Sequence, residues 1–180
     1  MVAGGLSMEA LWYPGADLEQ EFYAWQRHKS KAVNHVLWFA AVAQGDAHTL
    51  SPGRLVGLGV DLVELQRVER ALGRWGERLI EKLMDPGEAA CLPPEGPVRV
   101  HAVACAIAGK EAASKAIGTG WSRGVRWRDV VVTLGPPARV QLLARAAEVA
   151  RRLGSDGSTA VELEERDGLV LGRVALLDRR

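Results

Sequence analysis

The sequence predicts an α+β fold. Three observations favour this class: an alternating run at 55–61, a long helical stretch at about 100–117, and two β-rich runs at 160–165 and 169–177 that are separated by Asp167-Gly168. Strands joined mostly by hairpins, with helices between them, are typical of α+β proteins. The chain has 180 residues, of which 48% are apolar and 25% are charged. This composition is sufficient for one folded domain with a buried core.

The composition also excludes some classes of function. The formal net charge is only +1, whereas a nucleic-acid-binding protein usually carries a clear basic excess. The longest apolar stretch, Val36–Ala43, is far shorter than the roughly 20 residues that a bilayer-spanning helix requires. The N-terminus lacks a basic region followed by an apolar run, which a secretory signal would have. We therefore expect a cytoplasmic protein with neither a nucleic acid nor a membrane as its partner.

Residues 1–50 differ in composition from the rest of the chain. They contain seven of the ten aromatic residues, and the stretch Asp46–Arg54 that follows has the composition of a linker. Leu18, Phe22 and Trp25 have helical spacing. We interpret residues 1–50 as a helical N-terminal extension and residues 51–180 as the main domain. A helical hairpin packed on that domain is favoured over a docking surface for a partner, because amphipathic stripes usually face a core.

The main domain is expected to begin with a strand at 55–61. Alternation places its side chains on two faces, one with Val56, Leu58 and Val60 and the other with Gly57, Gly59 and Asp61. Glycines beside a carboxylate at the end of a strand leave room for another group to approach the backbone. A helix should follow, and four arginines line its outer side at steps of three and four residues: Arg67, Arg70, Arg74 and Arg78.

The remaining elements follow from periodicity and turn residues. A helix is expected over about 100–117 and is closed by Gly118. Next come a β run at 129–134, a proline break at 136–137, a strand from Arg139 and a helix over about 142–153. The chain should end in a hairpin that turns at Asp167-Gly168.

The helix at 100–117 carries the residues with the clearest chemistry. Its apolar stripe of Val103 and Ile107 continues at the same spacing into Glu111 and Lys115. An i, i+4 ion pair on a solvated helix end would explain these two residues without any function. If Asp61 lies close to Glu111, however, the two carboxylates could hold Mg²⁺, which takes one or two protein carboxylates and fills its shell with water and phosphate.

Several groups near this helix could bind phosphates. Lys110 and Lys115 would supply positive charge. The glycine-rich exit of the helix would supply backbone amides, at Gly118 and Gly120.

Two segments together resemble a known family. Gly57–Val68 (GLGVDLVELQRV) and Gly109–Gly120 (GKEAASKAIGTG) look like the two signature motifs of the holo-acyl-carrier-protein synthases, which are small 4′-phosphopantetheinyl transferases. Between them, Glu81–Glu88 (EKLMDPGE) resembles the family's stretch ahead of its second motif. The likeness covers about residues 55–135 well, and both motifs occur in the family's order.

The resemblance implies a fold and a reaction. It implies a phosphopantetheinyl transferase-like fold, with a long central helix against a small, mostly antiparallel sheet, in a homotrimer with active sites between subunits. Such enzymes use Mg²⁺ and transfer 4′-phosphopantetheine from coenzyme A to a serine of an apo acyl carrier protein, releasing adenosine 3′,5′-bisphosphate. By motif position, Asp61 and Glu111 would bind the metal, Lys115 would contact the phosphates, and Glu111 or a nearby water would accept the serine proton. Arg67, Arg70 and Arg74 would orient the acidic carrier protein.

The sequence departs from the family at three places. The last hairpin usually carries a serine–histidine pair, whereas this chain has Val161–Arg166 (VELEER), whose three acids would repel coenzyme A if they pointed inward. The usual Arg-Phe that opens the second motif is Ala106-Ile107 here, and residues 1–50 have no counterpart. These departures leave two alternatives: a relative that binds a carrier protein without transfer, or one that acts on carrier-bound intermediates. The retained Asp61, Glu111 and Lys115 favour the transferase.

Overall fold

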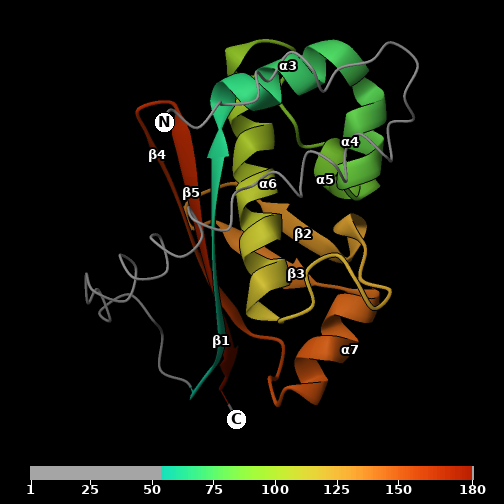
Figure 1. Ribbon diagram of the computed structural model, residues 1–180, viewed down its shortest axis with the longest axis vertical. Coiled ribbons are helices and arrows are strands. Elements are labelled where there is room, and N and C mark those ends of the chain that lie inside the picture. The colour runs from blue at the N-terminus through green and yellow to red at the C-terminus, as the bar shows by residue number, and fades with distance from the viewer. Residues whose placement is uncertain (1–53, 180) are drawn as a thin grey trace, which may run out of the picture. The chain divides into compact units, whose positions relative to one another are not determined.

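The computed structural model describes residues 54–179 (Figure 1). Its elements follow one another in the order β1 (Arg54–Glu64), α3 (Leu65–Trp75), α4 (Glu77–Leu83), α5 (Pro86–Ala89), α6 (Pro97–Ala116), the 3₁₀ turn η3 (Trp127–Asp129), β2 (Val130–Thr133), β3 (Arg139–Leu142), α7 (Ala144–Arg152), β4 (Thr159–Arg166) and β5 (Leu169–Asp178). The predicted extension at 1–50 lies outside the described residues, so the domain division stays a prediction.

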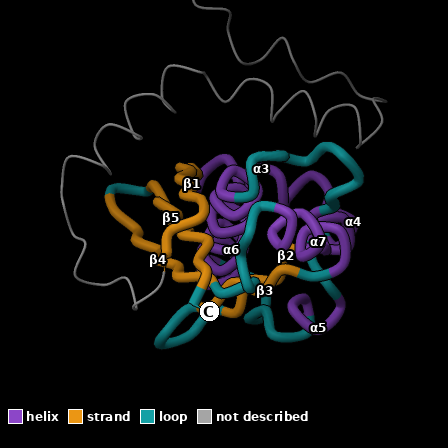
Figure 2. The backbone as a smooth tube through the Cα atoms, turned by 90° about the horizontal axis from the view of Figure 1, so that it is seen from below, coloured by secondary structure: helices purple, strands orange, loops and turns teal. Residues whose placement is uncertain are grey.

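The described residues form two antiparallel sheets around a central helix. One sheet has the strand order β1–β5–β4, and the other pairs β2 with β3. Helix α6 lies between the larger sheet and α4 (Figure 2). It buries 14 of its 20 residues, so it is covered on nearly every side. The α+β class and the antiparallel arrangement are confirmed.

The predicted hairpin forms with a two-residue turn. Asp167 and Gly168 connect β4 to β5 and both have positive φ, at 54° and 76°. Two positive φ angles are what a type I′ turn requires, and Asp-Gly is among the sequences that adopt it most readily.

Helix α6 approaches the sheet so closely that three glycines are required. A Cβ at Gly57 would lie 2.1 Å from the carbonyl oxygen of Ala116, and one at Gly59 would lie 1.9 Å from that of Ala112. On β5, a Cβ at Gly172 would lie 2.6 Å from the carbonyl oxygen of Ala108. The group that the glycines of the first strand make room for is therefore the backbone of α6.

We expect Gly59→Ala to lower the free energy of unfolding by at least the roughly 1–3 kcal/mol typical of overpacking. The new methyl group would overlap backbone atoms of α6, which cannot move aside as a flexible side chain can. Gly73→Ala is the matched control, because nothing lies within 4 Å of the Cβ position at Gly73 in α3. Urea denaturation of both variants tests this; equal stability of the two would show that α6 can withdraw from β1 at little cost.

Two helix boundaries differ from their predictions. Helix α6 begins at Pro97, about one turn earlier than expected, and proline suits the first turn because its missing N–H has no helical acceptor there. Helix α3 ends at Trp75, and Gly76, with a φ of 54°, separates it from α4. Arg78 therefore belongs to α4 and does not continue the arginine row of α3.

None of the helices within residues 54–179 is long and apolar enough to cross a membrane.

Candidate active site

Asp61 lies on the face of β1 that packs against α6. It is 1% exposed, and it follows Gly57 and Gly59 on that face by strand alternation. The sequence predicted this shared face. A buried carboxylate requires a partner, since an unpaired buried charge is very costly.

Lys115 supplies that partner from the last turn of α6. Its Nζ donates a hydrogen bond to Asp61 Oδ1 at 2.9 Å and another to the carbonyl oxygen of Val60 at 2.9 Å. The Lys115 side chain is 31% exposed. The pair therefore joins a buried carboxylate to a lysine whose side chain is partly exposed.

Glu111 lies one turn before Lys115 and is 6% exposed. The position of Asp61 along α6 follows from its neighbours in the sheet. Gly172, which is opposite Asp61 on β5, packs against Ala108, while Gly59 packs against Ala112. Asp61 thus faces the segment of α6 around Ala108 to Ala112, on which Glu111 also lies, and the structure joins Asp61 directly to Lys115.

The donor set at this place suits Mg²⁺. Asp61 and Glu111 supply two carboxylates from facing elements, and Mg²⁺ commonly binds through one or two carboxylates together with water and phosphate. Across residues 54–179, no three His, Cys, Asp or Glu side chains are grouped as metal ligands. A metal ion here would therefore depend on substrate oxygens to complete its shell.

Arg67 lies closer to this site than its predicted position in an outer row of arginines implied. Burial lowers the pKa of the Arg67 guanidinium, while the nearby carboxylates of Glu64 and Asp61 act in the opposite direction. Arg67 is half-buried, whereas Arg70 and Arg74 are exposed on α3. The guanidinium of Arg74 also lies over the ring of Trp75, 5.6 Å from its centroid. Among the three, Arg70 and Arg74 are thus the exposed members of the predicted row.

Lys110 does not lie in the site, and its predicted phosphate contact is wrong. It is 0% exposed, and its Nζ donates to Glu88 Oε2 at 2.6 Å and to the carbonyl oxygens of Trp127 and Val130. Burial lowers the pKa of the Lys110 ammonium, and the Glu88 carboxylate opposes that shift. Lys110 joins α6 to α5 and to the start of β2.

Sequence reasoning missed Glu88, although a local signal was present. Asp85 and Glu88 form a capping box at α5, in which Asp85 Oδ1 accepts from the Gly87 amide and Glu88 Oε2 accepts from the Asp85 amide. The other oxygen, Glu88 Oε1, accepts from the backbone N–H of Val132 at 3.0 Å. One carboxylate therefore connects α5, α6 and β2.

The amides of Gly118 and Gly120 already have acceptors within the protein. Gly118 N donates to the carbonyl oxygen of Lys115, and Gly120 N donates to that of Ser114, at 3.0 and 3.1 Å. Both glycines have positive φ, so they close the end of α6 as Gly118 was predicted to do. Phosphate binding by these amides stays a prediction, and it would require them to give up the carbonyl acceptors that they have at the helix end.

The acidic hairpin does not direct its three glutamates into one place. Arg173 faces away from α6, since its neighbour Gly172 contacts the helix, and it pairs with Glu162 at 2.9 Å and Glu164 at 3.7 Å. Glu165 alternates to the α6 side, where its Oε2 lies 3.9 Å from His101 Nε2. Glu162 and Glu164 thus share the single positive charge of Arg173 on the outer face of the sheet.

His101 also lies beside a thiol on α6. Cys105 Sγ is 3.7 Å from His101 Nε2, and burial, with a further contribution from Glu165, raises the pKa of the Cys105 thiol to about 11. The thiol stays protonated at neutral pH and is not an activated nucleophile.

Comparison with known proteins identifies the family. The family model for the 4′-phosphopantetheinyl transferase superfamily matches residues 57–168, which include Asp61, Glu111 and Lys115. The chain belongs to this superfamily. It is 38% identical over 106 residues to the holo-[acyl-carrier-protein] synthase of Maridesulfovibrio salexigens, covering 57% of this chain and 83% of that protein.

Solved structures of such synthases share the superfamily fold seen here. The holo-[acyl-carrier-protein] synthase of Neisseria meningitidis aligns with a TM-score of 0.58 at 24% identity, over 68% of this chain and 98% of that one. The Helicobacter pylori synthase, solved in complex with coenzyme A, aligns with a TM-score of 0.56 at 20% identity, over 66% and 98% of the two chains. The phosphopantetheinyl transferase-like fold expected from the motifs is confirmed.

Proposed function

We propose that this protein transfers 4′-phosphopantetheine from coenzyme A to a serine of an apo acyl carrier protein. The observation that carries the proposal is the Asp61–Lys115 ion pair beside Glu111, which lies within the segment that matches the transferase superfamily. Relatives that are 38 and 43% identical, each over at least four-fifths of their length, are holo-[acyl-carrier-protein] synthases.

The reaction is a phosphoryl transfer, and these residues suit its needs. The serine oxygen forms a bond to the phosphorus that carries the pantetheine arm, and the bond from that phosphorus to the oxygen of adenosine 3′,5′-bisphosphate breaks. Catalysis of such a step is mainly positioning and charge neutralisation. Lys115, held by Asp61, places a cation beside the pyrophosphate. Glu111, or a water held by it, accepts the serine proton.

The proposal includes Mg²⁺ with Asp61 and Glu111 as its ligands. When bound, the ion neutralises charge on the pyrophosphate as it is cleaved. Two buried carboxylates support this assignment, because Asp61 on β1 faces the stretch of α6 that carries Glu111.

The proposal extends to assembly and location. We place the enzyme in the cytoplasm as a homotrimer with sites between neighbouring subunits. An exposed apolar side chain on the outer face of β1, Leu58 at 37% exposure, supports a contact through that face of the sheet. The acids of the hairpin remain compatible with coenzyme A, because Arg173 pairs with Glu162 and Glu164.

Intact-mass analysis of an apo carrier protein tests the proposed function. We expect a gain of one phosphopantetheine after incubation with this protein, coenzyme A and Mg²⁺, and no gain when the metal is chelated. No gain with several carrier proteins, together with no coenzyme A binding in calorimetry, would contradict the proposal. Such a result would favour the alternative that this protein binds carrier proteins without transferring phosphopantetheine. The absence of the usual serine and histidine from the hairpin is consistent with that alternative.

We expect Arg70→Glu to raise the KM for the carrier protein several-fold and leave kcat unchanged. Arg70 is exposed on α3, and attraction between unlike surfaces acts mainly on the encounter of two proteins. The salt dependence of kcat/KM should become shallower, because one long-range attraction is lost. Arg152→Glu on α7 is the matched control and should leave KM unchanged. Equal kinetics of the two variants would exclude α3 as the docking surface.

A further inference from the structure

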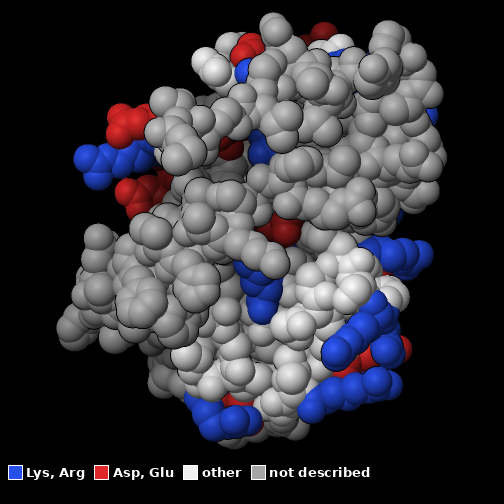
Figure 3. All heavy atoms as spheres, in the orientation of Figure 1, with Lys and Arg blue, Asp and Glu red and all other residues white. Residues whose placement is uncertain are grey.

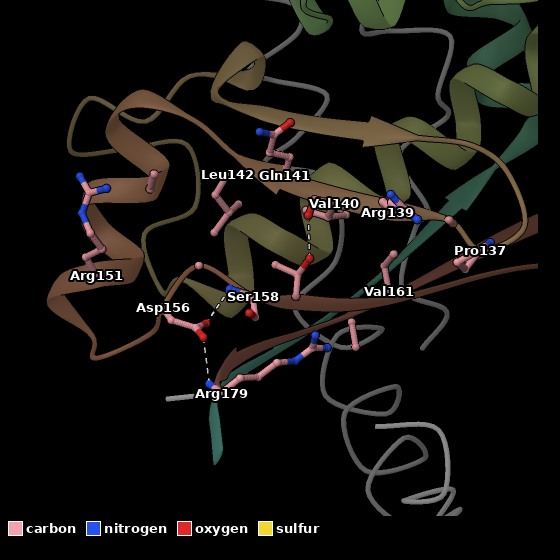
Figure 4. Close-up of a pocket in the computed structure, with 15 residues that line it drawn as sticks. Pro137, Arg139, Val140, Gln141, Leu142, Arg151, Asp156, Ser158, Val161 and Arg179 are labelled. Atoms are coloured by element: carbon pink, nitrogen blue, oxygen red, sulfur yellow. Dashed lines mark hydrogen bonds between the residues drawn. The ribbon is translucent and has the colours of Figure 1, made fainter. Parts of the chain in front are cut away.

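A cavity outside the candidate active site lies between β3, α7 and the loop that leads into β4. Figure 4 shows it, and its volume is about 810 Å³. Small-molecule sites commonly measure roughly 300–1,000 Å³. Its walls come from 137–142, Ala147, Arg151, 156–161 and Arg179, so Asp61, Glu111 and Lys115 do not line it.

The charge around this cavity is predominantly positive. Arg139 of β3, Arg151 of α7 and Arg179 after β5 line the cavity and are exposed, and Figure 4 shows the Arg151 side chain on the side of α7 away from the other labelled residues. None of these three guanidinium groups forms an ion pair with another residue in 54–179. Figure 3 likewise shows Lys and Arg side chains gathered toward the α7 end of the domain.

The single carboxylate that lines the cavity has a structural role. Asp156 Oδ1 accepts a hydrogen bond from the Ser158 amide at 2.8 Å, and Asp156 Oδ2 accepts one from the Arg179 amide at 3.0 Å. Asp156 therefore ties the loop before β4 to the segment after β5. With three arginines and one aspartate, the lining carries a formal net charge of +2.

The free edge of β3 adds hydrogen-bond donors to the same cavity. Val140 is opposite Val132 in the sheet, and the N–H of Val132 donates to Glu88 instead of to Val140. Val132 and Val140 therefore form a non-hydrogen-bonded pair of the antiparallel ladder. The backbone groups of Val140 then point away from β2 and toward β4, as the hydrogen bond from Thr159 Oγ1 to the Val140 carbonyl oxygen shows. The N–H groups of Val140 and Leu142 are therefore directed to the β4 side, where the cavity lies.

We propose that this cavity binds a small organic anion through a phosphate or carboxylate group. Guanidinium groups are planar donors that match the oxygens of both groups, and backbone N–H donors on one wall complement them. Apolar atoms of Val140, Leu142 and Val161 provide a surface for the remainder of the ligand. The site is separate from the Asp61–Lys115 pair, so an anion here and coenzyme A at the active site can be bound together.

Isothermal titration calorimetry of the full chain tests this inference, with pyrophosphate and citrate as the probes and with saturating coenzyme A to occupy the active site. We expect saturable binding of one molecule of at least one probe per chain. Arg139→Gln and Arg151→Gln should each weaken it at least fivefold. Arg152→Gln, the adjacent exposed arginine of α7 that does not line the cavity, should leave it unchanged.

The possible results distinguish a phosphate ligand from a carboxylate ligand, and they distinguish failure of this inference from failure of the proposed function. Binding of pyrophosphate alone assigns a phosphate group to the ligand, and binding of citrate alone assigns a carboxylate. No saturable heat with either probe, an equal loss in Arg151→Gln and Arg152→Gln, or a signal that coenzyme A abolishes would overturn the inference. If Arg139→Gln transfers phosphopantetheine at the rate of the unaltered protein, then the proposed function stands even where anion binding at the cavity is not found.

Discussion

Asp61→Asn is expected to reduce phosphopantetheine transfer by about 10²–10³-fold, the usual cost of removing one group that stabilises a transition state electrostatically. The substitution keeps the shape of the side chain but removes the charge that holds Lys115 and that would bind Mg²⁺. Rates of carrier-protein modification, followed by intact mass at saturating coenzyme A, measure the effect.

The stability of the Asp61→Asn variant should fall far less than its activity. Lys115 retains access to solvent, and the amide oxygen of asparagine can still accept its hydrogen bond. Thermal unfolding and circular dichroism check that the fold persists. Glu69→Gln removes an exposed carboxylate from α3 and is the matched control, with no expected change in rate. Full activity of Asp61→Asn would exclude Asp61 as a metal ligand and as a catalytic residue.

Lys110→Met is expected to lower the free energy of unfolding by about 3–5 kcal/mol, because removal of one partner leaves a buried charge without compensation. Glu88 would keep its backbone donors, Val132 and Asp85, but would lose its ammonium partner in a site where its side chain is 4% exposed. Urea denaturation measures the change.

The double variant Lys110→Met/Glu88→Gln separates charge from packing. It removes both charges and keeps an oxygen that can accept the Val132 N–H, so it should recover part of the stability lost in Lys110→Met. No recovery would show that the loss in the single variant comes from packing of the lysine stem. Lys82→Met, at the end of α4, provides a comparison outside this buried pair.

The sequence was sufficient to predict those elements and residue positions that local patterns determine. The Asp167-Gly168 turn follows from local φ preferences, and the shared face of Gly57, Gly59 and Asp61 follows from strand alternation. The i, i+4 spacing of Glu111 and Lys115 fixes their common side of α6. The contact between β1 and α6 could be predicted only from the family resemblance.

The incorrect assignment of Lys110 involves a partner that is distant in sequence, whereas the differences at Gly118, Gly120 and Arg67 arise from local contacts. Lys110 is adjacent to Glu111, yet it points to Glu88, a partner supplied by α5, and no local pattern reveals that pairing. Gly118 and Gly120 were correctly placed at the helix end, where their amides donate to the carbonyl oxygens of Lys115 and Ser114. Arg67 shares helical spacing with Arg70, but it lies nearer the end of β1 and is half-buried there.

The pairing of β1 with β5 has a consequence for synthesis of the protein. Within the described residues, β1 is an edge strand whose neighbour in the sheet is β5, the last strand of the chain, and Asp61 lies opposite Gly172. During translation, the strand that carries Asp61 is made before β5 and has to wait for β5 to emerge from the ribosome before the two strands can pair. A nascent chain that stops before residue 169 lacks that neighbour, so the sheet that positions Asp61 can form only after β5 has been made.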